Sequence, residues 1–158
     1  MSVQLTILIG IPGSGKSTLA RQLAAEAPDT ELISTDALRH EMMGHIRNKT
    51  QDDLIFAEAR QRARTALSQG KNVVYDATNV TRRARRPFVQ LAQEMAVPVQ
   101  AAWIYCPKVV ALMRNRAREF PVPDHAIDEM DEDLEVPTET EGFTNILKFS
   151  GGLNDYSS

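Results

Sequence analysis

The glycine-rich segment GIPGSGKS, at residues 10–17, has the residue types and the spacing of a phosphate-binding loop. It matches the pattern G-x-x-x-x-G-K-[S/T], in which the glycines allow successive backbone N–H groups to face one anion. Lys16 supplies a mobile cation for the β- and γ-phosphates of a nucleotide, and the Ser17 hydroxyl suits Mg²⁺. The segment therefore predicts a binding loop for ATP and Mg²⁺. Its expected contact residues are Gly10, Gly13, Ser14, Gly15, Lys16, Ser17 and Thr18.

Two carboxylates follow predicted strands, at the sheet edge where this loop would lie. In a parallel α/β sheet, ligands bind beyond the carboxyl ends of the strands. Asp36 comes directly after the second predicted strand, in STDALR, and Asp76 ends the third, in NVVYD. Asp36 could accept the proton of a hydroxyl that attacks a phosphate, or it could only cap the following helix. Asp76 could hold Mg²⁺, orient an arginine, or form a turn together with Asn79.

Arginines are the third group of residues suited to phosphate chemistry, because the planar guanidinium binds phosphate oxygens well. The chain has 13 arginines and five lysines, and the arginines gather at 60–64, 82–86 and 114–118. The cluster at 60–64 has the pattern of a solvated helix face. The cluster at 82–86, which includes Arg82 and Arg83, opens a helix and could bind a phosphate or form a solvated patch.

Arg39 lies three residues after Asp36, so both side chains share one face of the predicted helix. They could form a surface pair. Alternatively, Arg39 holds an anionic group of the phosphate acceptor while Asp36 faces its hydroxyl.

The last arginine cluster precedes FPVP at residues 120–123, where a helix must end. An arginine-bearing helix that ends at prolines is suited to a lid that closes over a triphosphate, here at about residues 108–136. Arg114 and Arg118 would then stabilise the charge on the transferred phosphate.

The elements that must position these residues alternate between strand-like apolar runs and helical patterns. Strands are expected near 3–9, 31–34, 72–75, 99–105 and 145–149, and helices near 16–26, 36–43, 51–69, 87–96, 108–118 and 124–134. Thr50 and Asp53 suggest a capping box for the third helix, and Thr81 is the expected cap of the fourth. The sequence therefore predicts an α/β fold with a parallel sheet of four to five strands flanked by helices. We expect one domain at residues 1–149 and a flexible tail at 150–158.

Composition excludes several classes of protein. The net charge of −3 argues against a globally basic nucleic-acid binder, and no apolar run approaches the ~20 residues of a membrane span. The single cysteine, Cys106, excludes an intrachain disulfide, and no basic leader precedes the first strand. We expect a cytoplasmic protein without membrane contact; the oligomeric state is left open.

Taken in order, GIPGSGKSTLAR, STDALR, VVYDATN and RNRAR…PVPDHAIDEM resemble the kinase domains of phage and bacterial 5′-OH polynucleotide kinases. The resemblance covers about residues 3–136 and implies an adenylate-kinase-like P-loop fold with the phosphate-loop strand at the centre of the sheet. It implies that Asp36 is the general base and that Arg39 binds the acceptor's phosphate. It also implies that Arg114 and Arg118 are lid arginines, and that Lys16 and Ser17 bind ATP and Mg²⁺.

The chain departs from that family at DATN, where the family has Asp-Thr-Asn, and in a slightly shorter spacing between the lid arginines and VP. The acceptor-binding residues suggested by the sequence are Arg39, Asp76, Asn79, Arg82 and Arg83. The favoured function is transfer of the γ-phosphate to the 5′-hydroxyl of DNA or RNA, in nucleic-acid repair. A small-molecule kinase that acts on a sugar, sugar acid, antibiotic or nucleotide sugar is the alternative. A nucleotide-dependent switch or binding module is less suited to Asp36 and Arg39, because a switch needs no acceptor base.

Overall fold

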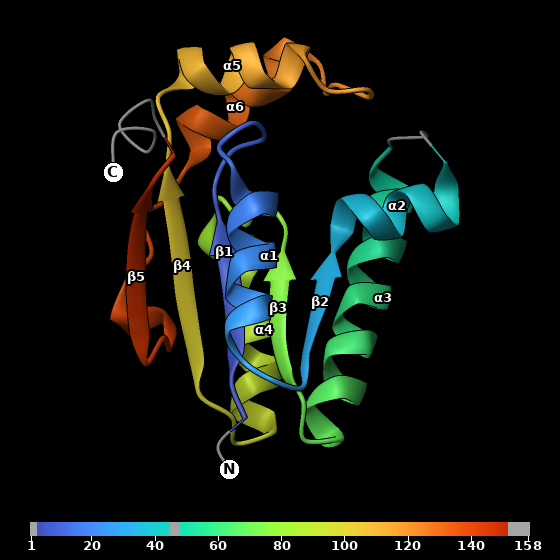
Figure 1. Cartoon of the computed structure of the whole chain (residues 1–158), viewed down its shortest axis with the longest axis vertical. Helices are drawn as coiled ribbons and strands as arrows, with labels where there is room; N and C mark the ends of the chain where they lie inside the picture. The colour runs from blue at the N-terminus through green and yellow to red at the C-terminus, as the bar shows by residue number, and fades with distance from the viewer. Residues whose placement is uncertain (1–2, 45–47, 152–158) are drawn as a thin grey trace.

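The computed structural model describes residues 3–44 and 48–151, which form a parallel sheet of five strands covered on both faces by helices (Figure 1). The strands are β1 Leu5–Ile9, β2 Thr30–Ser34, β3 Asn72–Asp76, β4 Val99–Tyr105 and β5 Asn145–Ser150. The helices are α1 Lys16–Glu26, α2 Thr35–Met43, α3 Lys49–Ser68, α4 Arg82–Glu94, α5 Lys108–Arg116 and α6 Asp124–Asp133, with a 3₁₀ helix, η1, at Glu139–Glu141.

The strand order is β2-β3-β1-β4-β5, and every pair of neighbouring strands is parallel. All five residues of β1 are buried, because this strand is central and has helices over both faces. The predicted α/β fold is therefore confirmed, including the central position of the strand that leads into the phosphate loop.

Side chains of β1 alternate between two hydrophobic cores, as the period of a strand requires. Leu5, Ile7 and Ile9 pack in the larger core with residues of α3 and α4, whereas Leu8 packs in a second core with residues of α1. A third core joins α5 and α6 to the sheet through Ile11 and five other residues: Val80, Cys106, Ala111, Val122 and Ile127. The two last helices thus lie over the carboxyl ends of the strands, at the top of Figure 1.

Three local expectations differ from the structure. The N-cap of α3 is Asn48, whose side chain accepts a hydrogen bond from the Gln51 N–H, so the capping box expected at Thr50 and Asp53 was wrong. Helix α4 begins at Arg82, earlier than the expected start near 87, and Pro87 is accommodated inside it. The expected cap, Thr81, is confirmed, since its side chain accepts a hydrogen bond from the Ala84 N–H.

The end of the chain also differs in part. Ser150 is the last residue of β5, and Gly151 donates a hydrogen bond from its N–H to the carbonyl of Tyr105, at 2.6 Å. The remainder of the expected flexible tail, 152–158, lies outside the described residues.

Candidate active site

The phosphate loop connects β1 to α1, and its backbone leaves donors exposed for an anion. Gly15 is the N-cap of α1 at a φ of 98°, and no side chain caps the helix there. Lys16 begins the helix and is 9% exposed, at the wall of a cavity. Gly13, at a φ of 85°, approaches α5 so closely that a Cβ would collide with the carbonyl of Ala111. Uncapped N–H groups at a helix N-terminus, beside a lysine, fit a bound phosphate chain.

Ser17 and Asp76 lie together beside this loop, although 59 residues separate them in sequence. The Ser17 hydroxyl donates to Oδ2 of Asp76 at 3.0 Å, and Asp76 is 5% exposed at the end of β3, next to β1. These oxygens are ligands of the kind that Mg²⁺ prefers. No group of three or more histidine, cysteine or acidic side chains suited to a metal occurs among residues 3–44 and 48–151. The site therefore fits a Mg²⁺ ion that takes its other ligands from phosphate and water.

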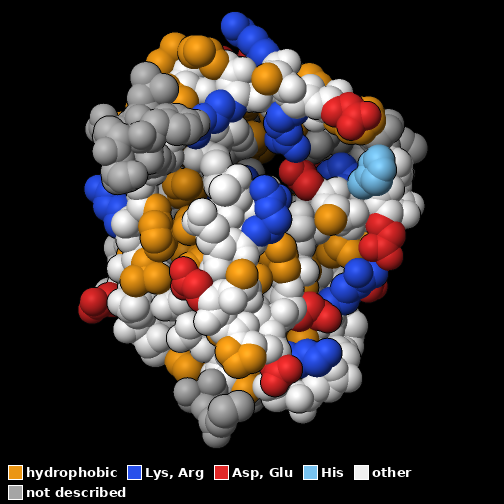
Figure 2. Space-filling model, viewed as in Figure 1, with side chains coloured by type: hydrophobic (Ala, Val, Ile, Leu, Met, Phe, Trp, Pro, Cys, Tyr) orange, Lys and Arg blue, Asp and Glu red, His pale blue; other side chains and the backbone are white. Residues whose placement is uncertain are grey.

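A cavity of about 280 Å³, which we call the acceptor cavity, extends from the loop to the lid helices. Positive and negative side chains gather around the hollow below the upper helices in Figure 2. The charged residues that line the acceptor cavity are Lys16, Asp36, Arg39, Asp52, Asp76 and Arg118. The structure thus brings Asp36, Arg39 and Asp76 to one space beside the phosphate loop.

Asp36 is not the cap of α2. The cap is Ser34, whose hydroxyl oxygen accepts from the Ala37 N–H at 3.2 Å, and Asp36 lies in the first turn. The Asp36 side chain is half exposed, and its Oδ2 accepts a hydrogen bond from Nη2 of Arg118 at 3.1 Å. Its carboxylate therefore lines the acceptor cavity and pairs with Arg118, which follows α5.

Arg39 is 8% exposed and pairs with Asp52 of α3, with Nη1 2.5 Å from Oδ1. The Arg39 Nη1 is held by the Asp52 carboxylate, whereas Nε lacks a hydrogen-bond partner in the described part of the chain. Buried donors without such a partner are unfavourable unless a ligand or water completes them. The sequence does not identify Asp52 as the partner of Arg39, because no pattern in the sequence predicts that α2 and α3 contact each other here.

Arg114 and Arg118, the two arginines that the sequence predicted to belong to a lid, reach different places. Arg114 Nη1 donates to the Gly151 carbonyl at 2.5 Å and lies 3.4 Å from the Ser14 carbonyl of the phosphate loop. It also lines a cavity of about 710 Å³ on the α1 side of the loop, which we call the donor cavity. The other residues of the donor cavity are Ser14, Gly15, Thr18, Leu19, Gln22, Ile104, Phe149 and Ser150. The phosphate loop therefore borders both cavities, with Arg114 at the donor cavity and Arg118 at the acceptor cavity.

Asn115 lies in α5 between these arginines, and no motif or periodic pattern in the sequence points to it. It is fully buried; its side-chain nitrogen donates to the Val122 carbonyl at 2.7 Å, and its oxygen accepts from the Val122 N–H at 3.1 Å. These paired bonds fix the turn that carries Arg118. Arg116 instead pairs with Asp124 at 2.8 Å on the surface, where the hydrogen bond raises the pKa of the guanidinium.

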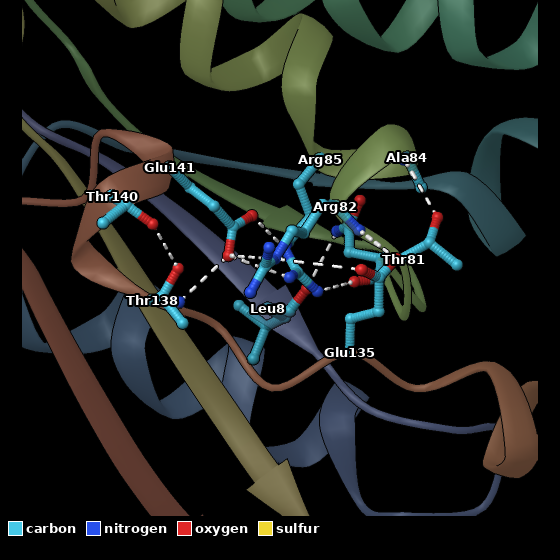
Figure 3. A network of polar contacts seen from close by, with 10 residues as sticks. Leu8, Thr81, Arg82, Ala84, Arg85, Glu135, Thr138, Thr140 and Glu141 are labelled. Atoms are coloured by element: carbon cyan, nitrogen blue, oxygen red, sulfur yellow. Dashed lines mark hydrogen bonds and ion pairs between the residues drawn. The ribbon is translucent and has the colours of Figure 1, made fainter.

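The arginine cluster at the start of α4 is not a continuous basic patch (Figure 3). Arg85 is fully buried: its Nε and Nη2 donate to the two carboxylate oxygens of Glu141 at 2.8 and 3.0 Å, and Nη1 donates to the Asn79 carbonyl at 2.8 Å. Arg82 is half exposed and lies 3.8 Å from Glu135 and 3.9 Å from Glu141.

Asn79 connects this network to the central strand, because its amide nitrogen donates to the Leu8 carbonyl at 2.8 Å. The network therefore fixes the segment between β3 and α4, which begins directly after Asp76. Asn79 and Arg82 have partners within the protein, and of the suggested acceptor-binding arginines at 82–86 only Arg83 lines a cavity that adjoins the acceptor cavity.

The AAA_33 family, described as an AAA domain, matches residues 5–137. The bifunctional polynucleotide phosphatase/kinase of Schizosaccharomyces pombe is 30% identical over 149 residues, which cover 90% of this chain and 32% of that protein. The chain thus spans about a third of the length of that relative.

Solved structures share the fold. A chain of the Pnkp1/Rnl/Hen1 RNA repair complex matches with a TM-score of 0.73 at 24% identity, over 84% of this chain and 44% of its own. A putative kinase from Chloroflexus aurantiacus J-10-fl matches with a TM-score of 0.77 at 16% identity, over 98% of this chain and 91% of its own. A gluconokinase from Sinorhizobium meliloti 1021 matches with a TM-score of 0.65 at 20% identity, over 93% and 82%. With its phosphate loop at the centre of a parallel five-stranded sheet and its match over most of its length, the chain belongs to the AAA_33 family and shares the fold of P-loop kinases.

Proposed function

We propose that this protein transfers the γ-phosphate of ATP to the 5′-hydroxyl of a nucleic-acid strand. The observation that carries the proposal is the pair Asp36 and Arg39, which line one cavity beside Lys16. A 5′-terminal nucleotide presents a primary hydroxyl and, one sugar away, a 3′-linked phosphate. The half-exposed carboxylate of Asp36 suits the hydroxyl, and the buried guanidinium of Arg39, whose Nε has no hydrogen-bond partner among the described residues, suits the phosphate.

The proposed reaction needs little beyond positioning and charge stabilisation. Lys16 and the uncapped first turn of α1 bind the β- and γ-phosphates, and Ser17 with Asp76 would hold Mg²⁺. A bound Mg²⁺ would neutralise part of the phosphate charge. Asp36 accepts the proton of the 5′-hydroxyl as the oxygen forms its bond to phosphorus and the bond to the ADP oxygen breaks.

Arg118 has a second role in this proposal. Its guanidinium pairs with Asp36 and so holds this general base in the acceptor cavity. The same guanidinium places a positive charge near the transferred phosphate. Arg114 contacts the loop carbonyls at the donor cavity, where it would face the nucleotide. A role in strand repair and a cytoplasmic location stay predictions from the sequence. No helix in residues 3–44 or 48–151 is both long enough and apolar enough to cross a membrane.

A small-molecule acceptor is the second candidate, and the size of the acceptor cavity favours it. A volume of about 280 Å³ suits a sugar or a sugar acid, and the fold is shared with a gluconokinase. A neutral sugar has no group for Arg39, whereas a sugar acid has a carboxylate. The two candidates are therefore distinguished by comparing transfer to an acceptor with a phosphate group and transfer to an acceptor with a carboxylate.

The experiment measures kcat/KM for a nucleoside 3′-phosphate, for the same nucleoside without its phosphate, and for gluconate. The wild type should prefer the 3′-phosphate, and Arg39→Ala should remove most of this preference. Arg62→Ala is the matched control, because Arg62 pairs with Glu58 and Glu41 on the outer surface. Asp36→Asn should slow transfer to every acceptor by roughly 10²–10⁴-fold.

Two results would reject the proposal. Equal wild-type values for the nucleoside with and without its phosphate would remove the reason for a nucleic-acid acceptor. Efficient transfer to gluconate alone would assign the protein to the small-molecule kinases.

A further inference from the structure

A cavity of about 640 Å³ lies beside the acceptor cavity, between α3 and α4, and we call it the side cavity. Its lining is mainly apolar and aromatic, and includes the stacked rings of Tyr75 and Phe88, whose centroids are 3.7 Å apart at an angle of 12°. The size and lining are those of a site for a small, largely apolar ligand.

The side cavity adjoins the acceptor cavity, because Phe56, Ala77 and Thr78 line both. Phe56 lies one helical turn after Asp52, the partner of Arg39, on the same face of α3. Its side chain is 44% exposed, and no other aromatic ring stacks on it within residues 3–44 and 48–151. The Phe56 ring therefore lies between the proposed phosphate site at Arg39 and the apolar side cavity.

The charge at the rim of the side cavity is also informative. Arg82 forms an ion pair with Glu135, and Arg85 forms one with Glu141, as Figure 3 shows. Arg83 is exposed, lines the side cavity, and forms no ion pair within the described part of the chain. Asp53 and Arg60 also line the side cavity, so its rim carries charges of both signs. An aromatic ligand followed by a phosphate fits the apolar lining of this cavity together with Arg83.

We propose that the side cavity binds the nucleobase of the strand's 5′-terminal nucleoside, stacked on Phe56. The inference rests on the proposed function and adds the location of the base. In the proposed function, the 5′-hydroxyl contacts Asp36 and the 3′-phosphate contacts Arg39. The nucleobase is the remaining group of the nucleotide, and apolar contacts would bind it. Stacking accepts any base, because every base has a π-face, so the protein should select strand ends without selecting their sequence.

The test compares two acceptors that differ only in the base: deoxyadenosine 3′-phosphate and its abasic analogue, 1,2-dideoxyribose 3-phosphate. The wild type should show a higher kcat/KM for the acceptor with a base, by roughly 5- to 100-fold, the range that base–aromatic stacking provides. Phe56→Ala should remove most of this ratio and change kcat/KM for the abasic acceptor much less. Phe56→Leu, which keeps apolar surface without a ring, should give an intermediate ratio.

Phe120→Ala is the matched control. Phe120 is 41% exposed and lines a cavity of about 580 Å³ on the other side of Asp36 and Arg39, with its ring 6.0 Å from that of His40. The wild-type preference for the base should persist in Phe120→Ala. Thermal unfolding of each variant checks that the fold is retained.

Three outcomes overturn the inference. An unchanged ratio in Phe56→Ala means that the base does not meet this ring. Loss of the ratio in Phe120→Ala, and not in Phe56→Ala, places the base in the opposite cavity. A wild type that uses gluconate and neither nucleotide rejects the proposed function itself, which is a distinct result because no acceptor with or without a base is then a substrate.

Discussion

Replacement of Arg85 by methionine removes a buried guanidinium that joins α4 to η1 and to the segment after β3. Arg85 is fully buried and donates three hydrogen bonds, two to the Glu141 carboxylate and one to the Asn79 carbonyl. Methionine fills much of the same volume but leaves Glu141, only 9% exposed, with a charge that has lost its partner. Removal of one member of a buried ion pair costs about 3–5 kcal/mol.

The lower end of that range applies here, because the Glu141 carboxylate still accepts from the Thr138 N–H and lies 3.9 Å from Arg82. We therefore expect a loss of about 3 kcal/mol in the free energy of unfolding. The unfolding entropy of a chain of this length is about 0.33 kcal/mol/K, so Tm should fall by about 9 °C. Urea and thermal unfolding measure both quantities.

Arg82→Met is the control, because Arg82 lies on the same helix with ion pairs of 3.8 and 3.9 Å and a half-exposed side chain. It should cost less than about 1 kcal/mol. The double variant Arg85→Met/Glu141→Leu should recover part of the loss, because no buried charge then remains. A cost for Arg85→Met that equals that of Arg82→Met, or one below about 1 kcal/mol, would refute the reasoning.

Three further predictions concern the phosphate loop and the core below it. Lys16→Ala and Ser17→Ala should each slow phosphate transfer by at least roughly 10²-fold with Tm nearly unchanged, and full turnover in steady-state assays would contradict a role for the loop in catalysis. Gly13→Ala should lower the free energy of unfolding by at least about 1–2 kcal/mol, because a Cβ at a φ of 85° meets the Ala111 carbonyl; an unaltered urea midpoint would contradict this. The raised pKa of Tyr75 means that the unfolded chain ionises first as pH rises through its usual value of 10.0, so wild-type stability should fall above that pH, and Tyr75→Phe should flatten the fall in pH-dependent unfolding.

Periodic and local signals were sufficient for the fold. The apolar run of β1 and the pattern G-x-x-x-x-G-K-S together specify a buried strand, a tight loop and a helix, and the structure has all three. Parallel strands end at a common edge of the sheet, and this is why the positions of Asp36 and Asp76 in the sequence are sufficient to place both near the loop.

Partners distant in sequence could not be predicted. Arg85 belongs to a run of four arginines that has the composition of one charged patch, and only its helical position, facing the sheet, makes it a buried residue. Its carboxylate partner, Glu141, comes 56 residues later in an acidic, irregular segment. Asp52 likewise meets Arg39 only because α2 and α3 contact each other, and such contacts leave no periodic signal in a single sequence.

The close approach of Gly13 to Ala111 restricts how α5 can move relative to the phosphate loop. Backbone meets backbone there, and Arg114 adds a further contact between the same helix and the loop carbonyls, so α5 is attached to the phosphate loop without an intervening linker. A hinge at the start of α5 would have to break this contact. We expect α5 and the phosphate loop to move together, so a shift of the loop would also shift Arg118, which follows α5. A nucleotide that reshapes the loop would then displace the Arg118–Asp36 pair directly, and the donor and acceptor sites would be energetically coupled through the backbone.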